Sequence, residues 1–178
     1  MRTMLGALPF VAPGMLLWAA VSIVASPFLS RFFGASRLHA ALLLIALGLV
    51  LMATLPPTGA TLAGSGSYEE ACDLSRMTLA PFSELLRLNA TSLNVLLFVP
   101  LGITLGSLPW SRRSLVTVVA AFLLPLAIES FQLLIPILGR GCQSADVIDN
   151  TMGLVIGLTI GASGRWLLGT ARRTGPRT

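Results

Sequence analysis

Five apolar runs, each close to the length of a membrane-spanning helix, most constrain what this chain can fold into. They occupy approximately residues 7–29, 38–55, 92–108, 115–138 and 151–168. A helix needs about 20 mostly apolar residues to cross the hydrocarbon core of a bilayer. With 54% hydrophobic and 11% charged residues, the chain also has too little polar surface to coat a soluble globule. We predict an all-α, multi-pass membrane bundle of about five transmembrane helices, forming a single transmembrane domain over residues 1–178.

The first apolar run has a second interpretation, that of a cleaved signal peptide. Arg2 precedes the run, and residues 24–26 (Val-Ala-Ser) resemble a cleavage site. The apolar part of a signal peptide is usually about 7 to 15 residues long, which is shorter than this run. We expect a retained helix, with the cleaved signal peptide as the alternative.

The distribution of arginine predicts the orientation in the membrane. All basic residues are arginines, the net charge is +5, and cytoplasmic flanks of membrane helices collect positive charge. With the N-terminus outside and the C-terminus inside, the cytoplasmic side receives Arg31, Arg37, Arg112, Arg113, Arg165, Arg172, Arg173 and Arg177, and the outer side receives Arg2, Arg76, Arg87 and Arg140. We predict this orientation, with residues 169–178 as a basic cytoplasmic tail. Topology explains the charge, and we expect no nucleic-acid partner.

The long loop of residues 56–91 divides into two parts. Its first part contains GATLAGSGS (residues 59–67), whose composition is typical of a flexible connector. In its second part, residues 79–88, Phe82, Leu85 and Leu86 recur at helical spacing and predict a short interfacial helix. Such a helix is either a half-buried cap on the bundle or a lid over a substrate.

Small residues and prolines predict how the last helices pack. Gly102 and Gly106 repeat at four residues in the third apolar run, as do Gly153, Gly157 and Gly161 in the fifth. Glycines at this spacing let helices approach closely, here within one chain. Pro100 removes one backbone hydrogen bond from the third helix and predicts a kink there.

Six polar residues fall at the predicted outer ends of the third, fourth and fifth helices or in their connecting loop. Because an ionisable residue inside a membrane is costly, Glu129 is expected to face the bundle interior and to mark a site. The six are Asn94, Glu129, Gln132, Arg140, Asp146 and Asn150. We predict that they line a ligand-binding cavity open to the outer surface. In the alternative, they only stabilise the bundle: Glu129 is protonated or paired with Arg140, the amides join helices, and Asp146 caps a helix.

The sequence holds no recognised catalytic motif. His39 is the only histidine, so neither a histidine metal cluster nor a Ser/His/Asp triad can be assembled. Glu129, Asp146 and Asp149 form a weak pattern for Mg²⁺ beside a lipid phosphate clamped by Arg140. We predict neither a cofactor nor a metal site from it. Enzymatic activity stays open and is not favoured, with Glu129 as the candidate catalytic residue.

The two cysteines fall in loops that the predicted orientation places outside the cytoplasm, where disulfides are tolerated. Cys72 lies in the second loop and Cys142 in the fourth. A disulfide would tie the long loop over the polar residues. Two separate buried thiols are an equal alternative.

Three motifs resemble the VanZ-like family of bacterial membrane proteins. They are LAPFSELL, NVLLFVPLGITLG, and ES-F-Q followed by GRGCQSADVIDNTMGLVIG, and together they lie within a core of residues 78–161. The matching positions are Pro81, Phe82, Asn94, Pro100, Gly102, Glu129, Gln132, Arg140, Asp146, Asn150, Gly153 and Gly157. Asp149 and Cys142 depart from the usual pattern. The first two helices and the Gly/Ser loop show no such resemblance.

The resemblance implies a multi-pass protein of the cell membrane that belongs to the bacterial cell envelope. Some members of that family lower susceptibility to the lipoglycopeptide teicoplanin. Our leading expectation is binding of a cell-wall precursor lipid or a lipoglycopeptide, with membrane lipid as a further partner and no prediction of oligomeric state. The alternatives are an intramembrane enzyme acting on lipid-linked envelope material, with Glu129 as general acid and base, and an inert membrane scaffold.

Overall fold

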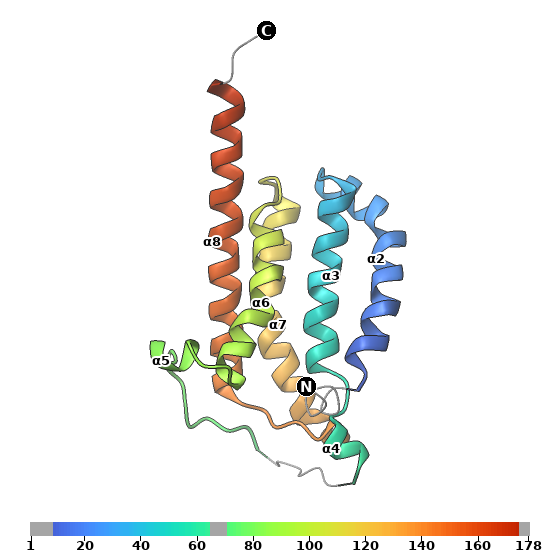
Figure 1. Ribbon diagram of the computed structural model, residues 1–178, viewed down its shortest axis with the longest axis vertical. Helices are drawn as coiled ribbons and strands as arrows, with labels where there is room; N and C mark the ends of the chain where they lie inside the picture. The colour runs from blue at the N-terminus through green and yellow to red at the C-terminus, as the bar shows by residue number, and fades with distance from the viewer. Residues whose placement is uncertain (1–8, 65–70, 175–178) are drawn as a thin grey trace.

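Five long helices form an antiparallel bundle in the computed structural model, which describes residues 9–64 and 71–174 (Figure 1). Successive helices run in opposite directions, so five helix ends and two connections gather at the lower end in Figure 1. The helices are α2 (Val11–Phe33), α3 (Arg37–Thr54), α6 (Ala90–Gly106), α7 (Arg112–Leu134) and α8 (Ser144–Thr174). The prediction of an all-α membrane bundle is confirmed.

Among the described residues, α2, α3, α7 and α8 are long and apolar enough to cross a membrane. The remaining long helix, α6, is also apolar but has 17 residues, so it is shorter than these four. It begins at Ala90, before the predicted apolar run of residues 92–108, because Asn89 and Ser92 form a reciprocal capping box that fixes the first turn there. Helix α8 begins at Ser144, before the fifth apolar run, so its first two turns carry polar residues into the bundle.

Helices α6 and α8 form the closest pair in the bundle. A Cβ atom at Gly157 would lie 2.8 Å from the Cα atom of Gly102, and one at Gly153 would meet the carbonyl oxygen of Val95. Only glycine allows backbones to approach this closely. The glycine spacing therefore has the packing role that the sequence indicates, and it lies within one chain.

The core and the outer surface of the bundle are both apolar, as expected for a protein surrounded by lipid. Val50, Phe98 and Leu154 are fully buried between the helices. On the outside, Val24 is 81% exposed and Leu123 is 60% exposed. An exposed apolar exterior of this extent fits the hydrocarbon of a bilayer. Helix α6 continues through Pro100, and the kink at that residue stays a prediction.

Two short helices in the long loop differ from expectation. The start of the predicted flexible connector is a helical turn, α4 (Gly59–Leu62), because the Thr58 side chain accepts a hydrogen bond from the Thr61 amide. The rest of the connector is described only as far as residue 64. The interfacial helix is present but is one turn long, α5 (Phe82–Leu85), and it follows Pro81.

The described arginines divide between the two ends of the bundle as predicted from the sequence. Arg113 donates to the Phe32 carbonyl oxygen at 2.9 Å, so the start of α7 lies beside the end of α2. At the same end of the bundle, Arg165 of α8 lines a cavity with Trp110. Arg76, Arg87 and Arg140 lie in the connections at the opposite end. Arg2 and Arg177 lie outside the described residues. Which end faces the cytoplasm stays a prediction.

Candidate functional site

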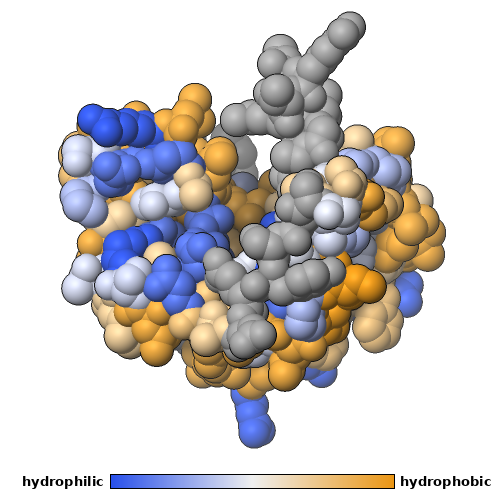
Figure 2. Space-filling model, turned by 90° about the horizontal axis from the view of Figure 1, so that it is seen from below, coloured by the Kyte–Doolittle hydropathy of each residue, from blue (hydrophilic) through white to orange (hydrophobic). Residues whose placement is uncertain are grey.

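The ends of α6, α7 and α8 bring the six predicted site residues to one end of the bundle. Asn94 lies near the start of α6, Glu129 and Gln132 near the end of α7, and Asp146 and Asn150 near the start of α8. Arg140 lies in the α7–α8 connection. Figure 2 views this end and shows hydrophilic residues gathered on the side that carries α5 and α8. The alternation of apolar runs therefore places these residues together, as predicted.

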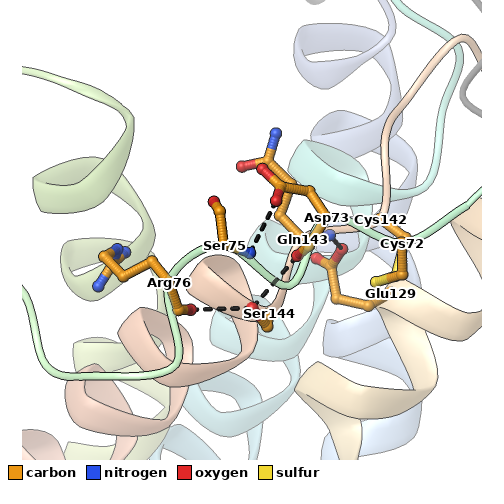
Figure 3. Close-up of a disulfide and its surroundings, with 8 residues drawn as sticks. All are labelled: Cys72, Asp73, Ser75, Arg76, Glu129, Cys142, Gln143 and Ser144. Carbon is orange, nitrogen blue, oxygen red and sulfur yellow. Dashed lines mark hydrogen bonds between the residues drawn. A yellow bond between two sulfur atoms is a disulfide. The ribbon is translucent and has the colours of Figure 1, made fainter.

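Glu129 is a buried carboxylate that holds the connection between α7 and α8. Its side chain is 3% exposed, and its Oε2 atom accepts a hydrogen bond of 2.9 Å from the backbone amide of Gln143 (Figure 3). Within the described part of the chain, no ion pair within 4.0 Å joins Glu129 to Arg140. The carboxylate thus satisfies a backbone donor just before α8 begins.

Gln132 and Arg140 both bind backbone carbonyl groups at the end of α3. The Gln132 amide donates to the Thr54 carbonyl oxygen at 3.0 Å, and Arg140 Nε donates to that of Pro56 at 3.0 Å. Arg140 Nη2 is buried and has no partner among the described residues. Burial lowers the pKa of Arg140, and the carboxylates of Glu129 and Asp146 oppose this change. These two side chains join the end of α3 to α7 and to the α7–α8 connection.

The start of α8 carries a second polar group. Asp146 lies in the first turn of α8, where the helix dipole favours an anion, and the Asn94 side chain of α6 lies near it and favours its charged form. Asn150 is 2% exposed, and its Oδ1 atom has no partner among the described residues. Asn94 thus links α6 to α8, while Asn150 keeps one unsatisfied acceptor in the interior.

An ion pair between Arg76 and Asp149 completes the polar end and was missed by the sequence analysis. Arg76 Nη2 lies 2.5 Å from Asp149 Oδ2, and the side chains are 26% and 0% exposed. Arg76 comes from the loop that precedes α5, which has no periodic pattern to predict a partner. The only signal was a carboxylate at position 149, one residue from Asn150, in an apolar helix.

Residues 72–76, here called the strap, are fixed along the α7–α8 connection. Cys72 and Cys142 form a disulfide, which settles the two alternatives left open by the sequence. The Asp73 amide donates to the Cys142 carbonyl oxygen at 2.8 Å, and the Ser144 amide donates to that of Asp73 at 2.9 Å. The Ser144 hydroxyl donates to the Arg76 carbonyl oxygen at 2.8 Å (Figure 3). The strap therefore holds the long loop against the start of α8.

A cavity of about 560 Å³ lies between α7, α8 and the strap. Its polar walls are Glu129, Ser130 and Ser144, beside the disulfide. Its apolar walls are Leu74, Met77, Leu126, Leu133, Val147 and Ile148. The cavity therefore differs from the predicted one, because its walls are mostly apolar and Glu129 is the one residue of the predicted six that lines it. Gln132 instead contacts the last residue of α3, Arg140 contacts Pro56 just beyond it, and Asn94 lies near Asp146 of α8.

The carboxylates considered for Mg²⁺ are engaged separately. Asp149 pairs with Arg76, and Glu129 accepts from Gln143. Residues 9–64 and 71–174 contain no group of three side chains placed to hold a metal ion. The chemistry that this end offers is hydrogen bonding and charge next to an apolar cavity.

The fold and these polar helix ends define a helical membrane protein with a mostly apolar cavity beside a buried carboxylate at one end. Residues 39–165 match the model of the VanZ/LLP1 family, and the chain belongs to this family. The match begins in α3 and extends beyond residues 78–161 at both ends, so α3 and the Gly/Ser loop also belong to the family's pattern. Comparisons with curated proteins and with solved structures found no match.

Proposed function

We propose that this protein binds an amphipathic, lipid-linked molecule of the bacterial cell envelope in the cavity between α7 and α8. One observation carries the proposal: a buried carboxylate, Glu129, stands in the wall of a cavity that is otherwise mostly apolar. Ligand sites typically combine apolar walls with a few polar groups that fix orientation. A membrane carboxylate without such a role would be costly.

The walls of the cavity suggest how such a ligand would lie. Leu126 is 56% exposed on the outer face of α7, so the cavity opens sideways toward lipid. A hydrocarbon chain would enter from the bilayer and pack against Leu126, Val147 and Ile148. The polar part would then lie near Glu129 and Ser144, under the strap.

This division between an apolar chain and a polar head fits two ligand classes. A cell-wall precursor lipid has a polyprenyl chain and a phosphorylated head, and a lipoglycopeptide has an acyl chain on a polar body. Membership of a family in which some proteins lower teicoplanin susceptibility supports the second class. On this proposal, the protein lowers teicoplanin susceptibility by holding one of these molecules at the outer surface of the cell membrane.

Replacement of Glu129 by glutamine tests the proposal because it removes the charge and keeps the fold. The glutamine carbonyl can still accept from the Gln143 amide, which Glu129 binds at 2.9 Å. We expect Glu129→Gln to abolish any teicoplanin phenotype and to weaken photocrosslinking of a teicoplanin derivative, because a carboxylate accepts hydrogen bonds from a polar head more strongly than an amide does, while the amount of inserted protein stays normal. Glu84→Gln is the matched control, since Glu84 is a more exposed carboxylate at the same end. Equal phenotype and crosslinking in Glu129→Gln and wild type would contradict the proposal.

A second candidate function is enzymatic, and it is favoured by the buried Nη2 atom of Arg140, which has no partner among residues 9–64 and 71–174. A guanidinium with a free donor is suited to a phosphate group, and Glu129 would then act as general acid and base on lipid-linked material. The test compares envelope lipid profiles of cells with wild type, Arg140→Ala and Arg87→Ala, where Arg87 is an exposed arginine at the same end. Profiles that do not differ between cells with and without the protein would exclude turnover.

The scaffold alternative predicts a different readout for the same residues. Gln132 and Arg140 join α7 and the α7–α8 connection to the end of α3 through backbone carbonyl groups. If this were their whole role, replacement would reduce the amount of folded protein in the membrane together with any phenotype. Measuring folded protein in each variant separates the scaffold from the binding function.

A further inference from the structure

A second cavity lies at the opposite end of the bundle, away from the strap and Glu129. Its volume is about 320 Å³, and it lies between the α6–α7 connection, the start of α7 and α8. Leu105, Leu108, Leu115, Val118 and Leu158 form its apolar walls. This volume falls within the range of about 300 to 1,000 Å³ that is typical of small-molecule sites.

Arg165 and Trp110 stand together in the wall of this cavity. Arg165 Nη1 donates to the Leu108 carbonyl oxygen, and its guanidinium carbon lies 5.9 Å from the centroid of the Trp110 ring. Trp110 is 85% exposed. A guanidinium has five donors, so this hydrogen bond leaves others for a ligand. An exposed tryptophan beside an arginine is the pair expected at the level of lipid headgroups.

The charge at this end is positive and has no nearby acid in the described part of the chain. Arg112 and Arg113 lie in the first turn of α7, on the same side of the bundle as Arg165. All described acidic residues lie at the other end, in the long loop or at the facing ends of α7 and α8; they are Asp73, Glu84, Glu129, Asp146 and Asp149. The cavity mouth therefore favours an anionic ligand.

We propose that this cavity binds an anionic phospholipid, with one acyl chain against the apolar walls and the phosphate at Arg165. Arginine binds phosphate through paired hydrogen bonds, and Trp110 would pack beside the glycerol region. The orientation predicted from the arginines places this end in the cytoplasmic leaflet, whose surface is negatively charged. The site is separate from the cavity beside Glu129 and does not depend on the function proposed for it.

Native mass spectrometry of the purified full chain tests the proposal with two lipids that share the same dioleoyl chains. We expect dioleoyl phosphatidylglycerol to bind about tenfold more tightly than dioleoyl phosphatidylcholine, because both lipids offer a phosphate to Arg165 but only phosphatidylcholine adds a trimethylammonium group that the arginines at this end repel. Arg165→Gln is expected to reduce this preference to less than about twofold, while Arg37→Gln retains it. Arg37 is an exposed arginine at the same end and does not line the cavity.

A cavity-filling variant keeps the test sharp if Arg165→Gln disturbs the contact with Leu108. Thr159 lines the cavity, and its hydroxyl donates only to carbonyl groups of its own helix. Thr159→Phe is expected to weaken phosphatidylglycerol binding about tenfold by occupying the acyl position. Thr117→Phe is the matched control, because Thr117 lies in α7 outside the cavity lining. Equal binding of the two lipids by wild type, or equal binding by the Thr159 and Thr117 variants, would overturn the proposal.

Discussion

The Arg76–Asp149 ion pair allows a quantitative prediction about how the strap is held. Asp149 is 0% exposed, so removal of Arg76 leaves a carboxylate in the interior without its cation. Arg76 is 26% exposed, so removal of the Asp149 charge leaves a cation that can still reach water. The two single substitutions are therefore expected to differ strongly in cost.

The magnitudes follow from this difference in exposure. Breaking a buried pair by removing one partner costs about 3 to 5 kcal/mol, and partial exposure of Arg76 places Arg76→Gln near about 3 kcal/mol. Asp149→Asn keeps a hydrogen-bond acceptor and is expected to cost about 1 kcal/mol. The double variant should also cost about 1 kcal/mol, since no unpaired buried charge remains. The expected coupling free energy between the two positions is thus about 3 kcal/mol.

Reversible unfolding in mixed micelles, measured for wild type, both single variants and the double variant, provides these free energies. Arg87→Gln is the control, because Arg87 forms only a 4.0 Å pair with Glu84 and is 75% exposed. It should change the free energy of unfolding by less than about 0.5 kcal/mol. An Arg76→Gln cost as small as that of Arg87→Gln, or a coupling near zero, would refute the role assigned to the pair.

Three further predictions concern packing, the disulfide and pH. Gly157→Ala should lower the free energy of unfolding by about 1 to 3 kcal/mol, because its Cβ would meet the backbone of α6. Gly164→Ala is the control, since open space surrounds Gly164, and its free energy of unfolding should stay unchanged. Replacing Cys72 and Cys142 by serine should lower the free energy of unfolding by at most about 4 kcal/mol. Reductant should lower the stability of the wild type and leave that of the serine variant unchanged. The Ser75 amide lowers the pKa of Asp73 below its ordinary 3.8, so this stabilisation is complete above pH 3.8 and is lost as pH falls through the lowered native pKa. In acid titrations that follow strap mobility, Asp73→Asn should lack this transition, and an identical transition in both proteins would contradict the assignment.

The sequence predicts the bundle well because hydrophobic length and glycine spacing are local properties. Gly102 and Gly157 could be assigned to a close helix contact from a four-residue repeat alone. Residues 59–62 form a helical turn where composition predicts a flexible connector, because the Thr58 side chain caps that turn. Thr58 also donates its backbone amide to the Leu138 carbonyl oxygen at 3.3 Å, a contact between distant segments that no local pattern shows.

For the candidate site, alternating helix direction was enough to bring Glu129, Asp146 and Asn94 to one end. It was not enough to say what each side chain contacts. The Glu129 carboxylate binds a backbone amide rather than Arg140, and Arg140 reaches the Pro56 carbonyl oxygen. Such contacts depend on how the connections fold over the helix ends. The position of the cavity between α7 and α8 depends on them as well.

The Cys72–Cys142 bond closes a covalent ring that contains both α6 and α7. In the predicted topology the chain crosses the bilayer twice between the two cysteines, so both sulfur atoms return to one compartment. Cys142 can reach Cys72 only after α7 has been inserted during synthesis, two residues before α8 begins at Ser144. A hairpin inserted with the opposite orientation would leave both thiols in the reducing cytoplasm. In the predicted orientation, the presence of this disulfide therefore indicates in which direction the hairpin of α6 and α7 was inserted into the membrane.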